Sequence, residues 1–118
     1  WGYWKAVRES AQVQRPMLLQ VSFAVSELNG CRYCVLHQVA GLRRVGVDVS
    51  KLQAMRKDDS SLDPTEKAAV TFARKLTKSA GAVSDSDFAA LKVAFPDDKA
   101  ALDILLQTCA FNFMNRFT

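Results

Sequence analysis

The sequence predicts an all-α domain, on three observations. Apolar residues recur at the three- and four-residue spacing of an amphipathic helix along most of the chain. No segment sustains the alternation of apolar and polar residues that marks a half-buried strand. Helix start and stop signals divide the chain into segments of helical length. With 118 residues, of which 49% are apolar and 24% charged, the chain is expected to form one domain over residues 1–118.

The N-terminal half is expected to form four helices. They cover about residues 1–11, 16–28, 31–45 and 51–56. Pro16 suits the first turn of the second helix, which is apolar on most sides and should therefore be buried on most sides. Asn29-Gly30 lies between two segments of helical period and is expected to break the helix, and Gly46 should end the next one.

The C-terminal half is expected to form three helices. They cover about residues 64–78, 84–93 and 99–116, with a polar loop at 57–62 and a break at 79–82. Asp63-Pro64-Thr65-Glu66 has the pattern of a capping box with a first-turn proline, and Ser84 with Asp87 repeats the box. Apolar residues occupy so wide an arc of the last helix that it should be either a central helix or part of a subunit interface.

A pair of cysteines, Cys31 and Cys34, carries the main chemical signal. On a helix this spacing places both sulfurs on one side, close enough to form a disulfide. Gly30 precedes the pair, so it should lie at a helix N-terminus, where the helix dipole favours the thiolate. A thiolate can attack a peroxide or a disulfide, and the second thiol can resolve the product. We therefore expect a redox-active disulfide without a further cofactor.

Several alternatives accompany this interpretation. The two thiols could be structural, or Cys31, Cys34, His37 and Cys109 could supply zinc ligands. His37, the single histidine, could be a general base, a cation beside the thiolate, or an ordinary packed or surface residue. Cys109 lies in the apolar last helix and is expected to be a buried, inert thiol.

The composition indicates which classes of binding partner and which cellular compartment to expect. The net charge of +4 comes from scattered Lys and Arg residues without a basic stripe, which argues against nucleic-acid binding. No apolar run is long enough to span a membrane. Three cysteines are an odd and small number for a disulfide scaffold and fit a reducing compartment, so we expect a cytoplasmic protein.

The run from Ser26 to His37 resembles the AhpD-like alkylhydroperoxidases of the carboxymuconolactone decarboxylase superfamily, in their peroxidase-related branch. Its Asn-Gly-Cys-x-Tyr-Cys core, residues 29–34, is the specific part. Further similarity lies in residues 46–48, 63–75 and 111–116. The resemblance thus spans most of the chain.

This resemblance implies a helical bundle of about six to seven helices with the CxxC pair at the start of a helix. It implies a homo-oligomer, such as a dimer, trimer or hexamer. It also implies reduction of a hydroperoxide, or electron relay to a disulfide, with a protein electron donor. Cys34 would be the attacking thiol, and Cys31 would resolve it and exchange electrons with the partner.

Two positions depart from the family pattern. The catalytic histidine of the family usually lies four residues after the second cysteine, where this chain has Gln38, and its relay glutamate lies twelve residues before the first, where this chain has Leu19. At about 100° per residue, Gln38 falls about 40° from Cys34 around the helix, whereas His37 falls about 60° away on the flank. Glutamine cannot take a proton at neutral pH.

Residues near the cysteine pair could therefore replace the missing proton relay. His37 could reach Cys34 from the side, and Glu27 or Gln20 could face the site from the preceding helix, although Glu27 could also simply face solvent. Glu27, Gln38 and Tyr33 are the candidate supporting residues around Cys31, Cys34 and His37. The alternative function is a non-enzymatic oligomerisation or binding module that retains the dithiol but lacks the relay.

Overall fold

The computed structural model describes residues 5–6, 12–57 and 62–117, and within these ranges it contains helices and turns but no strand. The elements are α2 (Arg15–Leu28), α3 (Arg32–Arg44), α4 (Val49–Lys57), α5 (Pro64–Lys78), the short 3-10 helix η1 (Ala80–Ala82), α6 (Asp85–Ala94) and α7 (Asp98–Phe117). The all-α prediction and its helices from residue 16 onward are confirmed. The predicted helix over residues 1–11 and the loop at 57–62 lie largely outside the described residues.

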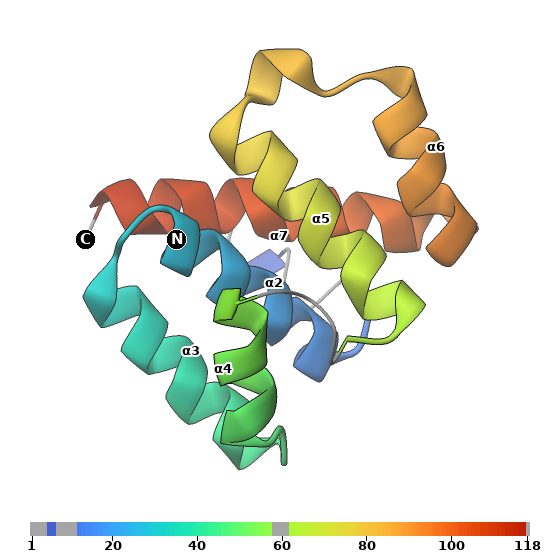
Figure 1. Ribbon diagram of the computed structural model, residues 1–118. Helices are drawn as coiled ribbons and strands as arrows, with labels where there is room; N and C mark the ends of the chain where they lie inside the picture. The colour runs from blue at the N-terminus through green and yellow to red at the C-terminus, as the bar shows by residue number, and fades with distance from the viewer. Residues whose placement is uncertain (1–4, 7–11, 58–61, 118) are drawn as a thin grey trace.

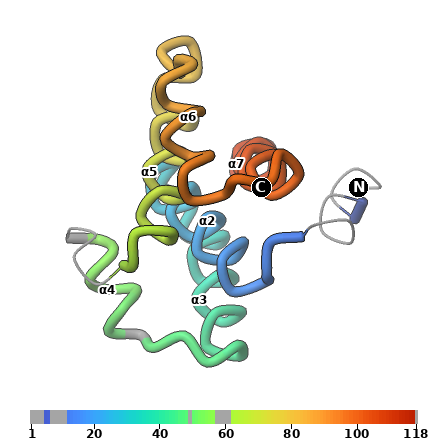
Figure 2. The backbone as a smooth tube through the Cα atoms, turned by 90° about the vertical axis from the view of Figure 1, so that its right-hand side faces the viewer, coloured from blue at the N-terminus to red at the C-terminus, as the bar shows by residue number. Residues whose placement is uncertain are grey.

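Helix α2 is the central element, and it contacts α3, α5 and α7 (Figure 1). Its middle is buried all round, which confirms the expectation drawn from its apolar sequence. The buried residues are Leu18, Gln20, Val21, Ser22, Phe23, Ala24, Val25 and Ser26. In the turned view of Figure 2, α3 and α4 lie at the lower end of the molecule, while α5 and α6 rise at the opposite end.

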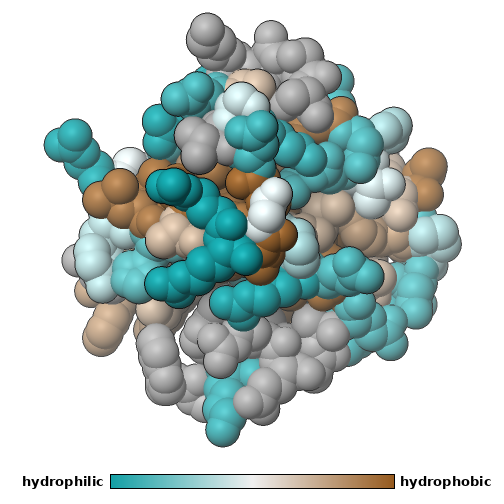
Figure 3. Space-filling view, turned by 90° about the horizontal axis from the view of Figure 1, so that it is seen from below, coloured by the Kyte–Doolittle hydropathy of each residue, from teal (hydrophilic) through white to brown (hydrophobic). Residues whose placement is uncertain are grey.

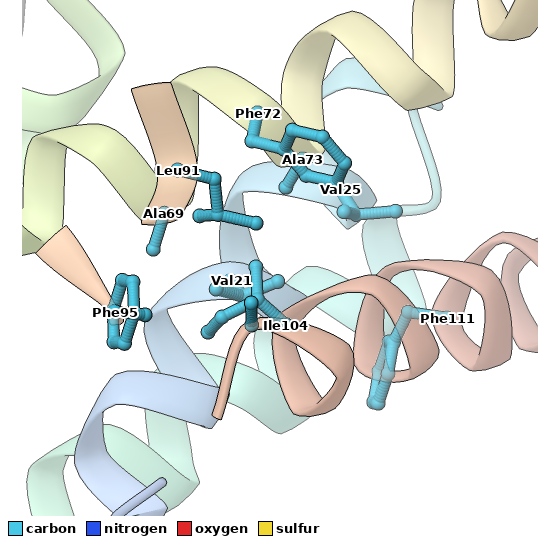
Figure 4. Close-up of a cluster of buried hydrophobic side chains, with 10 residues drawn as sticks. Val21, Val25, Ala69, Phe72, Ala73, Leu91, Phe95, Ile104 and Phe111 are labelled. Atoms are coloured by element: carbon cyan, nitrogen blue, oxygen red, sulfur yellow. The ribbon is translucent and has the colours of Figure 1, made fainter. Parts of the chain in front are cut away.

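Two apolar clusters flank α2. The first joins α2, α5, α6 and α7 (Figure 4) through Val21, Val25, Ala69, Phe72, Ala73, Leu91, Phe95, Ala101, Ile104 and Phe111. The second fixes α3 and α4 through Phe23, Ala24, Val35, Leu42, Leu52, Met55, Leu62 and Val70. Because α2 and α5 contribute to both clusters, the start of α3 is anchored to the same central helix as the main core.

Both predicted capping boxes are present. The Asp63 carboxylate accepts the Glu66 N–H at 2.8 Å, and the Glu66 carboxylate accepts the Asp63 N–H at 3.1 Å. At α6, the Ser84 N–H donates to the Asp87 carboxylate at 2.9 Å. These contacts satisfy backbone donors that a helix start leaves without partners, which is why so short a sequence pattern fixes where each helix begins.

The carboxylate of Glu66 is buried beneath this cap. Lys51 Nζ donates to both of its oxygens, at 2.8 and 2.6 Å. Burial alone would raise the pKa of Glu66, but hydrogen bonds from Lys51, from the Asp63 N–H and from Gln20 outweigh burial and lower that pKa below its ordinary value of 4.5. The carboxylate therefore joins α2, α4 and α5 in its charged form.

We expect Glu66→Gln to lower the free energy of unfolding by about 2 kcal/mol at neutral pH, since hydrogen bonds to charged groups are the stronger ones. The folded-state pKa of Glu66 lies below the unfolded value. The carboxylate therefore stabilises the fold fully above the unfolded value, and this stabilisation is lost as the pH falls through the folded pKa. Thermal unfolding at pH 7 and at about pH 3 should show a Tm difference between wild type and variant that shrinks on acidification.

The matched control is Asp98→Asn, because Asp98 pairs with Lys92 but its side chain is 88% exposed. This variant should leave Tm nearly unchanged, as exposed ion pairs contribute little. An equal loss of Tm for Glu66→Gln at both pH values would contradict the role assigned to the Glu66 charge.

Helix α7 packs against α2, α5 and α6 through one face, so it is not the central helix. The other face leaves Leu102, Phe113 and Phe117 exposed, and the rings of Phe113 and Phe117 stack with centroids 5.7 Å apart. On the face drawn in Figure 3, hydrophilic residues surround separate hydrophobic patches. None of the described helices combines the length and apolar character needed to cross a membrane.

Candidate active site at the Cys31–Cys34 disulfide

Cys31 and Cys34 form a disulfide at the start of α3, with their Cα atoms 5.3 Å apart. The three-residue spacing therefore brings both sulfurs to one side of the helix, as the sequence predicted. The bond joins the residue that precedes α3 to the third residue within it. Any chemistry at this pair thus takes place at a helix N-terminus.

The turn before α3 is fixed by its backbone. Gly30 has a φ of 69°, a left-handed conformation that glycine adopts without strain. The Cys31 N–H donates to the carbonyl of Ser26 at 3.1 Å, and the Cys31 carbonyl accepts the Val35 N–H at 2.9 Å. Asn29-Gly30 therefore ends α2 and directs Cys31 into the N-cap position of the next helix, as predicted.

The electrostatic setting favours a thiolate at Cys31. Its Sγ accepts the N–H of Cys34 at 3.4 Å, which is the contact that an N-cap side chain makes with the third residue of a helix. No acidic residue lies in the first turn of α3, and Arg32 adds a positive charge beside the pair. The helix dipole and the Cys34 N–H both stabilise negative charge at this sulfur.

The two cysteines differ in exposure. Cys34 is buried, with 6% of its surface accessible, whereas Cys31 is half-buried. Cys31 is therefore the more accessible residue of the pair.

Gln38 lies one helical turn beyond Cys34 and is 8% exposed. Its side-chain oxygen is buried without a hydrogen-bond partner among the described residues. Leu19 packs over Gly41 of α3, where an added Cβ would lie 3.5 Å from a Leu19 methyl carbon. The two positions that depart from the family pattern are thus a neutral amide and an aliphatic side chain in the α2–α3 contact, and neither can accept a proton at neutral pH.

His37 lies on the exposed flank of α3, as the helical count predicted. Its Nε2 and the hydroxyl of Tyr33 are 3.1 Å apart, and the two rings meet edge to face with centroids 4.9 Å apart. Tyr33 is itself 64% exposed. The imidazole therefore pairs with Tyr33 on the exposed side of α3.

Neither Glu27 nor Gln20, the two candidate substitutes from α2, forms a hydrogen bond to Cys31 or Cys34 among the described contacts. Glu27 forms an ion pair with Arg56 of α4 at 2.5 Å, and the Arg56 guanidinium also lies over the ring of Phe23. Gln20 hydrogen-bonds to Glu66 and lines a separate pocket of about 460 Å³ around the first half of α2. Among the described contacts, Glu27 therefore binds to α4 and Gln20 binds to α5.

The prediction of a buried Cys109 is wrong, because this thiol is exposed on α7. The helix is apolar on all sides, so its sequence does not reveal which arc packs against α2. Partial desolvation by its neighbours nevertheless raises the pKa of the Cys109 thiol. Within the described part of the chain, no group of three or more His, Cys, Asp and Glu side chains could hold a metal ion, so the zinc alternative lacks a ligand set there.

The structure also reveals side chains near the dithiol that the sequence analysis overlooked. Asn29 donates to both Asn112 and Asn115 of α7, and Asn115 donates in turn to Ser26. Two asparagines three residues apart in an apolar helix lie on one face, and that spacing was the available signal. Their partners lie 83 to 89 residues away in the chain, so the sequence could not name them.

No protein-family model matches the sequence, and no curated protein sequence is detectably similar to it. Solved structures, in contrast, match along nearly the whole chain. A peroxidase-related protein from Silicibacter sp. TM1040 superposes with a TM-score of 0.90 at 22% identity, covering 98% of this chain and 62% of the other. The chain thus spans about three-fifths of the length of that protein.

Two further structures share the architecture. A protein of unknown function from Agrobacterium tumefaciens, named for the antioxidant defence protein AhpD, gives a TM-score of 0.88 at 24% identity, covering 98% of this chain and 80% of the other. The debrominase Bmp8, as a Cys-to-Ala variant with 2,3,4-tribromopyrrole, gives 0.82 at 21% identity, with coverages of 98% and 63%. The chain therefore has the all-helical fold of the AhpD-like and peroxidase-related proteins, with a CxxC disulfide at the start of a helix.

Proposed function

We propose that this protein is a thiol-dependent oxidoreductase that reduces hydroperoxides, or relays electrons to disulfides, through Cys31 and Cys34. The observation that carries the proposal is the disulfide between these two residues at the N-terminus of α3, where a thiolate is stabilised. The shared fold with peroxidase-related and AhpD-like proteins supports it.

In the oxidative half of the cycle, the Cys34 thiolate attacks the terminal peroxide oxygen. The O–O bond breaks, Cys34 takes the terminal OH group to become a sulfenic acid, and the released alkoxide takes a proton from water to leave as the alcohol. The Cys31 thiolate then attacks the Cys34 sulfur, which forms the disulfide and displaces hydroxide, and the hydroxide takes a proton from solvent to become water. Burial of Cys34 is compatible with a small substrate in this step, because it limits the access of bulky thiols to this residue.

In the reductive half, a dithiol donor attacks Cys31, the more exposed sulfur, and Cys34 leaves as a thiolate. A second donor thiol then attacks the donor sulfur of the mixed disulfide, which releases Cys31 and leaves the donor oxidised. The Cys34 N–H that contacts Cys31 Sγ stabilises the Cys31 thiolate that leaves in this step. The cycle needs no cofactor besides the cysteine pair.

The assembly and compartment belong to the same proposal. The exposed, stacked rings of Phe113 and Phe117 on α7 support a homo-oligomer, since adjoining exposed apolar side chains often mark a subunit contact. A dithiol that must be reduced in every cycle suits a reducing compartment such as the cytoplasm. The partners are then a hydroperoxide or disulfide substrate and a protein electron donor.

The test is a coupled measurement on the purified chain. We expect the reduced protein, mixed with cumene hydroperoxide and dithiothreitol, to consume peroxide in many turnovers. Without dithiothreitol, one equivalent of peroxide should close the Cys31–Cys34 disulfide, a mass loss of about 2 Da. A dithiol that forms no disulfide and gives no turnover with hydroperoxide or with a small disulfide would rule the proposal out.

The structure also favours one specific alternative. Leu19 and Gln38 leave the dithiol without a buried proton acceptor at the two aligned positions, as expected for an oligomerisation or binding module that has lost catalysis. That alternative predicts oligomers in solution and no turnover in the same assay. Sustained peroxide reduction would exclude it.

A further inference from the structure

The turn that carries Cys31 is tied to α7 by a chain of side-chain amides. Asn29 Nδ2 donates to the side-chain oxygens of Asn112 and Asn115, at 3.1 and 3.0 Å. Asn115 Nδ2 donates to the hydroxyl of Ser26 at 3.0 Å. The backbone carbonyl of the same Ser26 accepts the Cys31 N–H. Asn115 is thus linked to the backbone of Cys31 through a single residue.

The chain of amides is anchored on a third helix. Asn112 Nδ2 donates to the Thr77 hydroxyl of α5 at 2.9 Å, and Arg116 donates to the Asn112 side-chain oxygen at 2.9 Å. Ser26 is fully buried, and both asparagines of α7 are half-buried. Removal of one partner from such a network leaves the remaining polar groups unsatisfied, so the network resists displacement.

This network contacts the end of α2 that leads into the turn before Cys31. The Cys31 sulfur caps α3 only while the turn between α2 and α3 holds Cys31 within reach of the Cys34 N–H. Asn29 and Ser26 lie at the end of α2, on the near side of that turn, and both are held by α7. If α7 releases them, the turn can shift and the sulfur loses its N–H donor.

We propose that Asn115, with Ser26 and Asn29, is a positioning residue that holds Cys31 in the N-cap of α3 and so sets the reactivity of the dithiol. The proposal rests on the proposed function, because it assigns these residues to the same redox site. None of them touches the reacting sulfur through its side chain. Their effect is transmitted through the backbone of the turn.

The experiment measures thiol alkylation in the reduced protein rather than peroxide turnover. Iodoacetamide labelling is followed against pH, and trypsin cleavage after Arg32 places Cys31 and Cys34 on different peptides for mass spectrometry. For Asn115→Ala, the pH midpoint of Cys31 labelling should rise by about half a unit, which is roughly a threefold loss of thiolate below the midpoint. Ser26→Ala should shift the midpoint in the same direction by a smaller amount.

The matched control is Gln107→Ala. Gln107 makes the same kind of buried contact between α7 and α2, donating to the Ser22 hydroxyl at 2.5 Å. It lies eight residues before Asn115, which is about 12 Å along the helix and away from the disulfide. This variant should lose comparable stability while the midpoint of Cys31 labelling stays at the wild-type value.

Equal midpoints in Asn115→Ala, Ser26→Ala, Gln107→Ala and wild type would overturn the proposal. If Asn115→Ala does not fold, the labelling midpoint of Ser26→Ala tests the proposal instead. This variant should fold, since alanine suits a buried helical position. A shifted midpoint in a protein without peroxide turnover would support the positioning role while the proposed function fails. An unshifted midpoint in an active enzyme would overturn the positioning role alone.

Discussion

Replacing Cys34 with serine is expected to abolish hydroperoxide reduction, with a loss on the order of 10³-fold or more in the second-order rate constant. Serine fits the buried position, but its hydroxyl is not ionised at neutral pH and cannot form the sulfenic acid. Cys31 would remain reactive toward thiol reagents, because its sulfur still caps α3. Stopped-flow consumption of peroxide by the reduced protein measures the effect directly.

Cys109→Ser is the control for this variant. Cys109 is an exposed thiol on α7, outside the first turn of α3, and its replacement should leave the rate unchanged. A full rate in Cys34→Ser together with a lost rate in Cys31→Ser would show that the assignment of the attacking thiol is reversed.

Replacing Gln38 with histidine is expected to raise the rate of peroxide reduction by about 10²-fold, because positioned general bases typically contribute 10²- to 10⁴-fold. Gln38 lies one turn beyond Cys34, and its buried side-chain oxygen has no described partner to lose. An imidazole at this position can take the proton of the Cys34 thiol, which the amide cannot. The pH profile of the variant should gain an ionisation in the range where histidine titrates.

Ala40→His supplies the matched control, since Ala40 is an exposed residue of α3 two positions farther along. At about 100° per residue its side chain points away from the position of Gln38, so this imidazole should give no gain. His37→Ala should change the rate only modestly, because its ring pairs with Tyr33 on the exposed flank. A loss in His37→Ala as large as that in Cys34→Ser would instead identify His37 as the working base.

The sequence sufficed where a feature is determined by neighbours in the chain. The boxes at Asp63 and Ser84 start helices because the cap and its partner are three residues apart. Gly30 ends α2 because its left-handed backbone costs other residues more. The disulfide follows from a spacing of three residues at a helix start. Each of these features could be predicted without knowledge of the tertiary packing.

The features that could not be predicted depend on which helix faces meet. Cys109 was placed in the core because α7 is apolar all round, yet α7 presents another arc to α2. Glu27 and Gln20 were candidates for the dithiol, but their partners are Arg56 and Glu66, on helices that no local pattern places beside them. For the same reason, the contact between Asn29 and Asn115 became visible only once α2 and α7 were packed.

The capping of α3 by the Cys31 sulfur has a consequence for how firmly the first turn of this helix is closed. The preferred N-cap side chains carry an oxygen acceptor, whereas α3 begins on a sulfur that would gain and lose electrons in the proposed cycle. In the structure the disulfide closes the first turn of α3, together with the Cys34 N–H contact to Cys31 Sγ and the Val35 N–H bond to the Cys31 carbonyl. Under the proposed function, reduction would remove this covalent closure, so we expect the start of α3 to fray more easily in the reduced protein than in the oxidised one.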